Sequence, residues 1–130
     1  MAGTIEQIRA GTILVVDDDA SLRLLCRVNL ELEGYHVLEA RTVAEAEETL
    51  AAGRVDLVLL DVHIGADDGI ALMRSLRHRK HTASVVLFTG SAQLDAETRT
   101  EADGVVAKPF RLDELLGVVN GLVRRAESGR

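Results

Sequence analysis

Five short apolar runs recur along the chain, and they predict the strands of a sheet. Three of them are near-continuous and rich in valine and leucine, which is typical of strands covered on both faces. The second run alternates apolar with polar side chains, so we expect it at an edge of the sheet. The runs are 12–16, 35–38, 55–60, 84–88 and 104–107.

Segments with apolar side chains at helical spacing separate the five runs. Thr42 and Glu45 form a capping box at the start of one helix, which we expect to stop at Gly53. The final helix carries an apolar stripe on one face, formed by Leu112, Leu115, Leu116, Val119, Leu122 and Val123. Two more helices are predicted over 21–33 and 69–79, with buried faces formed by Leu22, Leu25 and Leu32 in the first and by Ile70, Met73 and Leu76 in the second.

The segment 91–103 is the weakest helical candidate. Its apolar side chains are three alanines and Leu94, and they stand among charged residues, namely Asp95, Glu97, Arg99, Glu101 and Asp103. A helix here buries little apolar surface, so we expect it to be short or mobile.

Alternation of strands and helices predicts an α/β fold with one parallel sheet and helices on both of its faces. The length of 130 residues fits one domain, and we expect no output domain. We expect this domain to span 11–125, with flexible ends at 1–10 and 126–130.

Composition narrows the classes of partner. Six more acidic than basic side chains argue against nucleic acid as a direct partner, and three aromatic residues leave little to stack on bases. No apolar run approaches the ~20 residues of a membrane span. The single cysteine, Cys26, favours a reducing compartment, so we expect a cytoplasmic protein and a buried thiol. A basic run at 77–81 fits either a docking patch for an acidic partner or the end of a helix.

Polar side chains follow four of the predicted strands where each strand ends. The aspartates 17–19 follow the first strand, Asp61 the third, Thr89 the fourth and Lys108 the fifth. Because the carboxyl ends of parallel strands meet at one edge of an open sheet, these side chains are expected to lie together.

The chemistry of this edge suggests phosphoryl transfer. Clustered carboxylates need a proton or a cation, and oxygen ligands without histidine or cysteine favour Mg²⁺. A lysine and a hydroxyl suit phosphoryl oxygens, and a carboxylate can act as nucleophile. Taken singly, each residue has a plain alternative: the aspartates 17–19 can cap a helix, Asp61 and Thr89 can belong to turns, and Lys108 can be a surface lysine.

From Thr12 to Arg124 the sequence resembles the receiver domain of two-component response regulators. The motifs that carry the resemblance are Ile13–Asp19, Leu59-Leu60-Asp61 with Asp68-Gly69, Thr89-Gly90 and Lys108-Pro109-Phe110. The resemblance implies a flavodoxin-like, doubly wound, five-stranded parallel sheet in the order 2-1-3-4-5 with five helices.

The resemblance also implies a site. Asp61 would accept a phosphoryl group from a histidine kinase or a histidine phosphotransfer protein, and the domain would signal to a further protein by contact rather than act as an enzyme. Asp18, Asp61 and the backbone carbonyl of His63 would bind Mg²⁺ directly, and Asp17 through a water molecule. Thr89 and Lys108 would contact phosphoryl oxygens.

Three finer features follow from the same resemblance. His63 and Ser91 occupy positions that tune the lifetime of the phosphorylated state, and the Lys108–Pro109 peptide bond is expected to be cis. Two positions depart from the family pattern: Gly65 lies in the loop where a Met-Pro pair is common, and Val105 stands where the aromatic switch residue is expected. We therefore expect output through ordering of the loops and of the weak helical segment 91–103.

Two other functions remain open. Asp17 and Asp19 match the spacing of nucleophile and acid in haloacid-dehalogenase phosphatases, although Asp61 then has no role. The chain could also be a receiver-like interaction module that is never phosphorylated.

Overall fold

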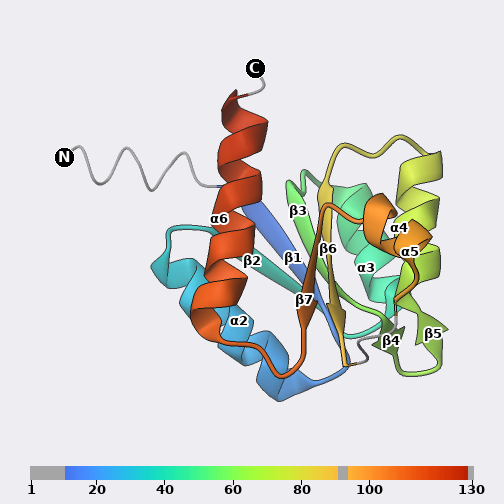
Figure 1. The fold of residues 1–130 in the computed structure, drawn as a ribbon, viewed down its shortest axis with the longest axis horizontal. Helices are drawn as coiled ribbons and strands as arrows, with labels where there is room; N and C mark the ends of the chain where they lie inside the picture. Colours follow the sequence, from blue (N-terminus) through green and yellow to red (C-terminus); the bar gives the residue numbers. More distant parts are fainter. Residues whose placement is uncertain (1–10, 91–93, 129–130) are drawn as a thin grey trace.

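The computed structural model describes residues 11–90 and 94–128, and these form one parallel sheet between two layers of helices (Figure 1). The sheet has the order β2-β1-β3-β6-β7. Its strands are β1 (Thr12–Val16), β2 (His36–Ala40), β3 (Leu57–Asp61), β6 (Ser84–Thr89) and β7 (Gly104–Ala107). The predicted fold class and the strand order 2-1-3-4-5 are confirmed, since β6 and β7 are the fourth and fifth strands of this sheet.

Five helices connect and cover the strands in the described part of the chain. They are α2 (Ala20–Leu32), α3 (Val43–Ala52), α4 (Gly69–His78), α5 (Ala96–Glu101) and α6 (Leu112–Ser128). α2 and α6 lie on one face of the sheet, and α3, α4 and α5 on the other (Figure 1). A small antiparallel hairpin, β4 (His63–Ile64) and β5 (Asp67–Asp68), precedes α4.

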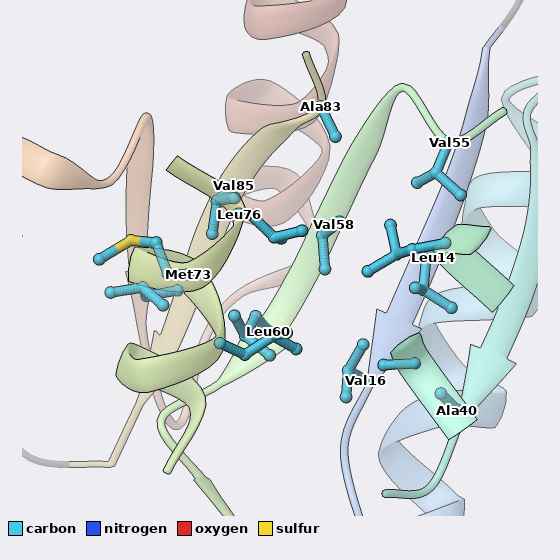
Figure 2. Packing of buried hydrophobic residues seen from close by; sticks show 14 of the residues in the cluster. Leu14, Val16, Ala40, Val55, Val58, Leu60, Met73, Leu76, Ala83 and Val85 are labelled. Atoms are coloured by element: carbon cyan, nitrogen blue, oxygen red, sulfur yellow. The ribbon is translucent and has the colours of Figure 1, made fainter. Parts of the chain in front are cut away.

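Alternating side chains of each strand divide the core into two halves. Leu14 and Val16 of β1 point to the face of α3 and α4, where Leu60 of β3 and Met73 of α4 belong to the same buried cluster (Figure 2). Ile13 and Val15 point to the opposite face, toward α2 and α6. Every residue of β3 is buried, because this central strand is covered on both sides.

Local sequence explains where α3 begins. The Thr42 hydroxyl accepts a hydrogen bond from the Glu45 N–H at 3.1 Å, as the capping box predicts. The Glu45 carboxylate reaches the N–H of Arg41 at 2.8 Å rather than that of the cap residue itself. The helix ends at Ala52, next to Gly53.

The predicted buried face of α2 is wrong for two of its three residues. Leu25 and Leu32 are exposed, whereas Cys26 and Leu30 are fully buried and Leu22 is partly buried. Apolar residues occur almost all round this helix, so periodicity alone does not select the face that meets the sheet. Cys26 is buried as expected, and this burial raises the pKa of its thiol to about 12.

The last two helices differ from each other in length. α5 has six residues, in agreement with the short helix expected near its segment. α6 has 17 residues and runs to Ser128, beyond the domain end expected at 125. Among the described residues, no helix is long and apolar enough to cross a membrane.

Candidate functional site

Parallel pairing brings the ends of four strands to one edge of the sheet. Val16 of β1 pairs with Leu60 of β3, Asp61 with Phe88 of β6, and Thr89 with Ala107 of β7. The residues that follow these pairs therefore emerge side by side. This edge carries the acidic, hydroxyl and lysine side chains that the sequence placed at strand ends.

Lys108 joins two of the carboxylates. Its Nζ atom lies 3.0 Å from Oδ2 of Asp17 and 3.0 Å from Oδ2 of Asp61. The same Nζ lies 5.8 Å from the centre of the Phe88 ring, which stacks on Phe110 at a centroid distance of 5.3 Å. The Lys108–Pro109 peptide bond is cis.

Burial and neighbouring charges set the protonation of this group of side chains. Burial raises the pKa of Asp17, and the charge of Asp61 adds to this, against the hydrogen bonds from the Asp19 N–H and Lys108. Burial alone would lower the pKa of Lys108, but its bonds to both aspartates and their charges raise it overall. The lysine is therefore a fixed cation between two carboxylates at neutral pH.

Asp17, Asp18 and Asp61 together fit a divalent cation. Each of them offers one carboxylate oxygen, and these three oxygens lie within 4.8 Å of one another. Asp17 is fully buried and Asp61 nearly so, whereas Asp18 is exposed. A set of hard oxygen ligands with one open side suits Mg²⁺, which keeps several of its water molecules.

Asp19 has a different role from its two neighbours. Its carboxylate is the N-cap of α2 and accepts the N–H groups of Ser21 at 2.9 Å and Leu22 at 3.3 Å. The capping alternative is thus confirmed for this residue. Asp17 and Asp18 instead face the group of acidic side chains that contains Asp61.

The loop after Asp61 contributes two backbone contacts that the sequence did not reveal. The His63 N–H donates to Oδ1 of Asp61 at 3.2 Å, and the Gly65 N–H donates to Oδ2 of Asp18 at 3.1 Å. Gly65 has a φ of +60°, which favours glycine at this turn of the hairpin. The sequence indicated only that a glycine stands in the loop where a Met-Pro pair is common.

Gly69 brings the start of α4 against the backbone of Asp61. A Cβ atom at Gly69 would lie 1.9 Å from the carbonyl oxygen of Asp61, so no larger residue fits without movement of one of the two segments. The Gly69 N–H also donates to the carbonyl of Val62 at 2.8 Å. The pair Asp68-Gly69 in the sequence is therefore a sign that the chain after β3 packs closely against this strand.

The remaining predicted residues lie around this group. Thr89 ends β6 and is buried, and His63 lies in β4 with an exposed side chain. Val105 lies in β7 and is partly buried. It occupies the position where the resemblance led us to expect an aromatic residue. Ser91 lies outside the residues that the structure describes.

Comparison with known proteins identifies this arrangement. Residues 13–120 match the response regulator receiver domain. The chain belongs to this family. Its resemblance to response regulators is therefore confirmed.

Relatives of this receiver domain include two transcriptional regulatory proteins. The chain is 36% identical over 124 residues to ResD of Bacillus subtilis, covering 94% of this chain and 52% of ResD. It is 37% identical over 120 residues to the phosphate regulon regulatory protein PhoB of Rhizobium meliloti, covering 88% of this chain and 53% of PhoB. The chain thus spans about half the length of these relatives.

A solved structure with Mg²⁺ and BeF bound shows the same fold. The response regulator TrrA of Thermotoga maritima, in complex with Mg²⁺ and BeF, superposes with a TM-score of 0.79 at 33% identity. The match covers 86% of this chain and 98% of that one.

Proposed function

We propose that this receiver domain accepts a phosphoryl group on Asp61 from a phosphohistidine of a histidine kinase or a histidine phosphotransfer protein. The observation that carries the proposal is the pair of bonds from one lysine ammonium to Asp17 and Asp61, beside a group of three carboxylates whose oxygens lie close enough together to hold a metal ion. Such an edge holds negative charge together with a fixed cation, as phosphoryl transfer requires.

In the proposed reaction an oxygen of Asp61 attacks phosphorus. The new bond joins that oxygen to phosphorus, while the nitrogen–phosphorus bond breaks and its electron pair returns to the donor imidazole. The Lys108 ammonium and the Thr89 hydroxyl contact the oxygens of the transferred group. Attack of water on the phosphoryl group then releases inorganic phosphate and returns the free carboxylate, so the domain assists both its own phosphorylation and its own dephosphorylation.

The residues proposed to bind Mg²⁺ are Asp18, Asp61 and the backbone carbonyl of His63, with Asp17 acting through a water molecule. The bound ion would offset the negative charge of the phosphoryl oxygens. The buried Asp17 and the exposed Asp18 follow β1, and Asp61 ends β3, so the ion would be held between the ends of these two strands. We propose that His63 and Ser91 tune the lifetime of the phosphorylated state.

An exposed apolar surface on α2 is the proposed contact for the phosphoryl donor. Among the described residues, the large apolar side chains that are exposed lie on this helix, with one more at the start of α6; they are Leu24, Leu25, Val28, Leu32 and Leu112. α2 begins directly after the acidic residues at the sheet edge. A donor that delivers its phosphoryl group to Asp61 therefore passes this surface.

The proposed output is a change in the order of α5 and the loop before it. The short helix α5 follows Thr89 in the chain. Because Val105 has no aromatic ring, it cannot change position with Thr89 as an aromatic switch residue would. NMR spectra of the free protein and of its beryllofluoride complex test this step. Unchanged signals across 94–103 would contradict it.

The phosphorylation itself is tested by the intact mass after incubation with acetyl phosphate and Mg²⁺. We expect the native protein to gain one phosphoryl group and Asp61→Asn to gain none. Asp67→Asn is the matched control, because it changes an exposed carboxylate in the same loop. A gain that is lost only in Asp17→Asn would support a phosphatase instead. Absence of both the gain and beryllofluoride binding would support a module that is never phosphorylated.

A further inference from the structure

Arg23 lies one turn into α2, and its side chain turns back toward the acidic edge. Its Nη1 donates to the backbone carbonyl of Asp17 at 2.7 Å, and its Nε donates to Oε1 of Glu39 on β2 at 3.1 Å. The Arg23 side chain is only 14% exposed. Both contacts are therefore more shielded from water than an ordinary surface pair.

The carbonyl that Arg23 binds belongs to the peptide unit between Asp17 and Asp18. A peptide unit is planar, so a bond to its oxygen fixes the direction in which both neighbouring residues leave it. The unit before Asp17 is fixed as well, because the Asp17 N–H donates to the carbonyl of Ala40 at 3.1 Å. Both peptide units of Asp17 are thus tied to β2, the second of them through Arg23 and Glu39.

Asp18 depends on this tie more than Asp17 does. Asp17 is fully buried, and its carboxylate is bound to Lys108 and to the Asp19 N–H. The Asp18 carboxylate is exposed and accepts a hydrogen bond from the N–H of Gly65, at the tip of the hairpin. Repulsion from the other two carboxylates acts to turn Asp18 outward.

Arg27 shows that charge alone does not explain the arrangement. Its Nη1 lies 2.9 Å from Oε2 of Glu39, and its Nε lies 3.3 Å from Oε2 of Glu31. Arg27 therefore shares Glu39 with Arg23, but its bonds go to the two glutamates and none of those seen reaches Asp17. The two arginines therefore form a matched pair: both bind Glu39, and Arg23 also binds the peptide unit between Asp17 and Asp18.

We propose that Arg23 is a positioning residue for the metal site. By fixing the peptide unit between Asp17 and Asp18, it holds the Asp18 carboxylate where it meets Mg²⁺ together with Asp61. This inference rests on the proposed function, since it concerns the same ion. It adds a residue outside the group of acidic side chains, and it makes Mg²⁺ affinity depend on a contact between α2 and β2.

Isothermal titration with MgCl₂ at constant ionic strength tests the inference on the unphosphorylated protein. We expect Arg23→Ala to weaken Mg²⁺ binding about 10- to 100-fold, as loss of a residue that orients a metal ligand does. Arg27→Ala removes the same charge and an equal share of the Glu39 contacts, and it should bind Mg²⁺ as the native protein does. Arg23→Lys keeps a donor within reach of the carbonyl and should recover part of the affinity.

The variants separate this inference from the function on which it rests. Native affinity in Arg23→Ala, or an equal loss in Arg23→Ala and Arg27→Ala, would overturn the role of Arg23 alone. A native Mg²⁺ signal that Asp18→Asn leaves unchanged would overturn the proposed metal site and the inference with it. Circular dichroism checks that each variant is folded. If Arg23→Ala fails to fold, Arg23→Lys decides the question. Native Mg²⁺ affinity of Arg23→Lys, together with a native rate of phosphorylation, would then count against the inference.

Discussion

The two helices on either side of β7 are held to the rest of the molecule in opposite ways. α6 lays an apolar stripe on the sheet, with Leu115 and Val119 fully buried against Phe88 and its neighbours. α5 has Thr98 as its buried side chain. One helix is thus stabilised by the hydrophobic effect, and the other by polar contacts.

Arginines of α4 make these polar contacts. Arg74 binds the Glu101 carboxylate at 2.9 Å and the Thr98 hydroxyl at 3.2 Å. Arg77 binds the backbone carbonyl of Glu101 and the carboxylate of Asp103, which also accepts the Val85 N–H at 2.7 Å. Figure 1 shows α4 and α5 side by side on this face of the sheet.

The difference shows which part of the domain is easiest to rearrange. Burying an apolar side chain contributes about 1.5–3 kcal/mol, whereas exposed ion pairs contribute about 0–1 kcal/mol. α5 therefore opens at a lower cost in free energy than α6 does. It also follows the buried Thr89 in the chain, which agrees with the proposed change in its order on phosphorylation.

The same contacts account for much of the basic run at 77–81. Arg77 binds the Asp103 carboxylate, and Arg79 binds Glu47 of α3 at 2.8 Å. Two of its cations are therefore used within the molecule. This supports a helix end more than a docking patch for an acidic partner.

The largest effect should come from the apolar contact of α6. Leu115→Ala leaves a cavity between α6 and the sheet and should lower the free energy of unfolding by about 2–5 kcal/mol, measured by urea denaturation. Leu116→Ala is the control, because Leu116 is only partly buried and should cost clearly less. Equal losses in the two variants would mean that the stripe does not hold α6 in the way described.

A smaller effect is expected for the polar contact of α5. Arg77→Ala removes the bonds to Glu101 and Asp103 and should lower the free energy of unfolding by about 1 kcal/mol or less. Its main result should be faster amide hydrogen exchange in 96–101, with α6 unchanged. A loss as large as that of Leu115→Ala would erase the contrast between the helices.

Salt should separate the two helices without any mutation. Raising the ionic strength from about 0.1 M to 1 M shortens the Debye length from about 10 Å to 3 Å, which weakens exposed ion pairs. We expect amide exchange in α5 to accelerate relative to α6 and the central strands. Exchange in α5 as slow as in β3 under both conditions would contradict the weak attachment of this helix.

The smallest effect concerns the acidic group at the edge of the sheet, Asp17, Asp18 and Asp61. Burial raises the pKa of Asp17 above its ordinary value of 3.8, so the folded protein holds this proton more firmly than the unfolded chain does. Stability from this group is present below the ordinary value and is lost as the pH rises through the raised value.

Asp17→Asn replaces this carboxylate by an amide that does not ionise, so the variant does not lose stability through this group as the pH rises. Without Mg²⁺, thermal melting at neutral pH should therefore occur at a higher temperature in the variant, with a flatter dependence on pH above 3.8. Asp67→Asn serves as the control for a change of one charge. A lower melting temperature in Asp17→Asn would show that the bond to Lys108 outweighs the cost of burying the carboxylate.

Much of the site follows from strand periodicity. The buried runs end at Asp17, Asp61 and Lys108, and parallel pairing is enough to bring these three residues to one edge of the sheet. Capping chemistry likewise predicts the start of α3 at Thr42. These features depend on local sequence and on one rule of sheet geometry.

Other features depend on contacts between segments far apart, and the sequence could not predict them. The buried face of α2 is set by the sheet it meets, since Leu25 and Leu32 are as apolar as Leu30. In the sequence, nothing distinguishes Arg23 from other arginines in helices. Only the structure shows that its guanidinium donates a hydrogen bond to the carbonyl of Asp17. The hydrogen bond from the Gly65 N–H to Asp18 likewise depends on the folded path of the hairpin, which the sequence does not show.

The hydrogen bond from Gly65 to Asp18 also gives the protein an internal spectroscopic reporter. The donor belongs to the backbone of a glycine, and glycine signals stand apart from most others in a proton–nitrogen correlation spectrum. The position of this one signal should follow the state of the Asp18 carboxylate. Events at the acidic edge can then be timed in the native sequence, without a fluorophore, a tag or a mutation.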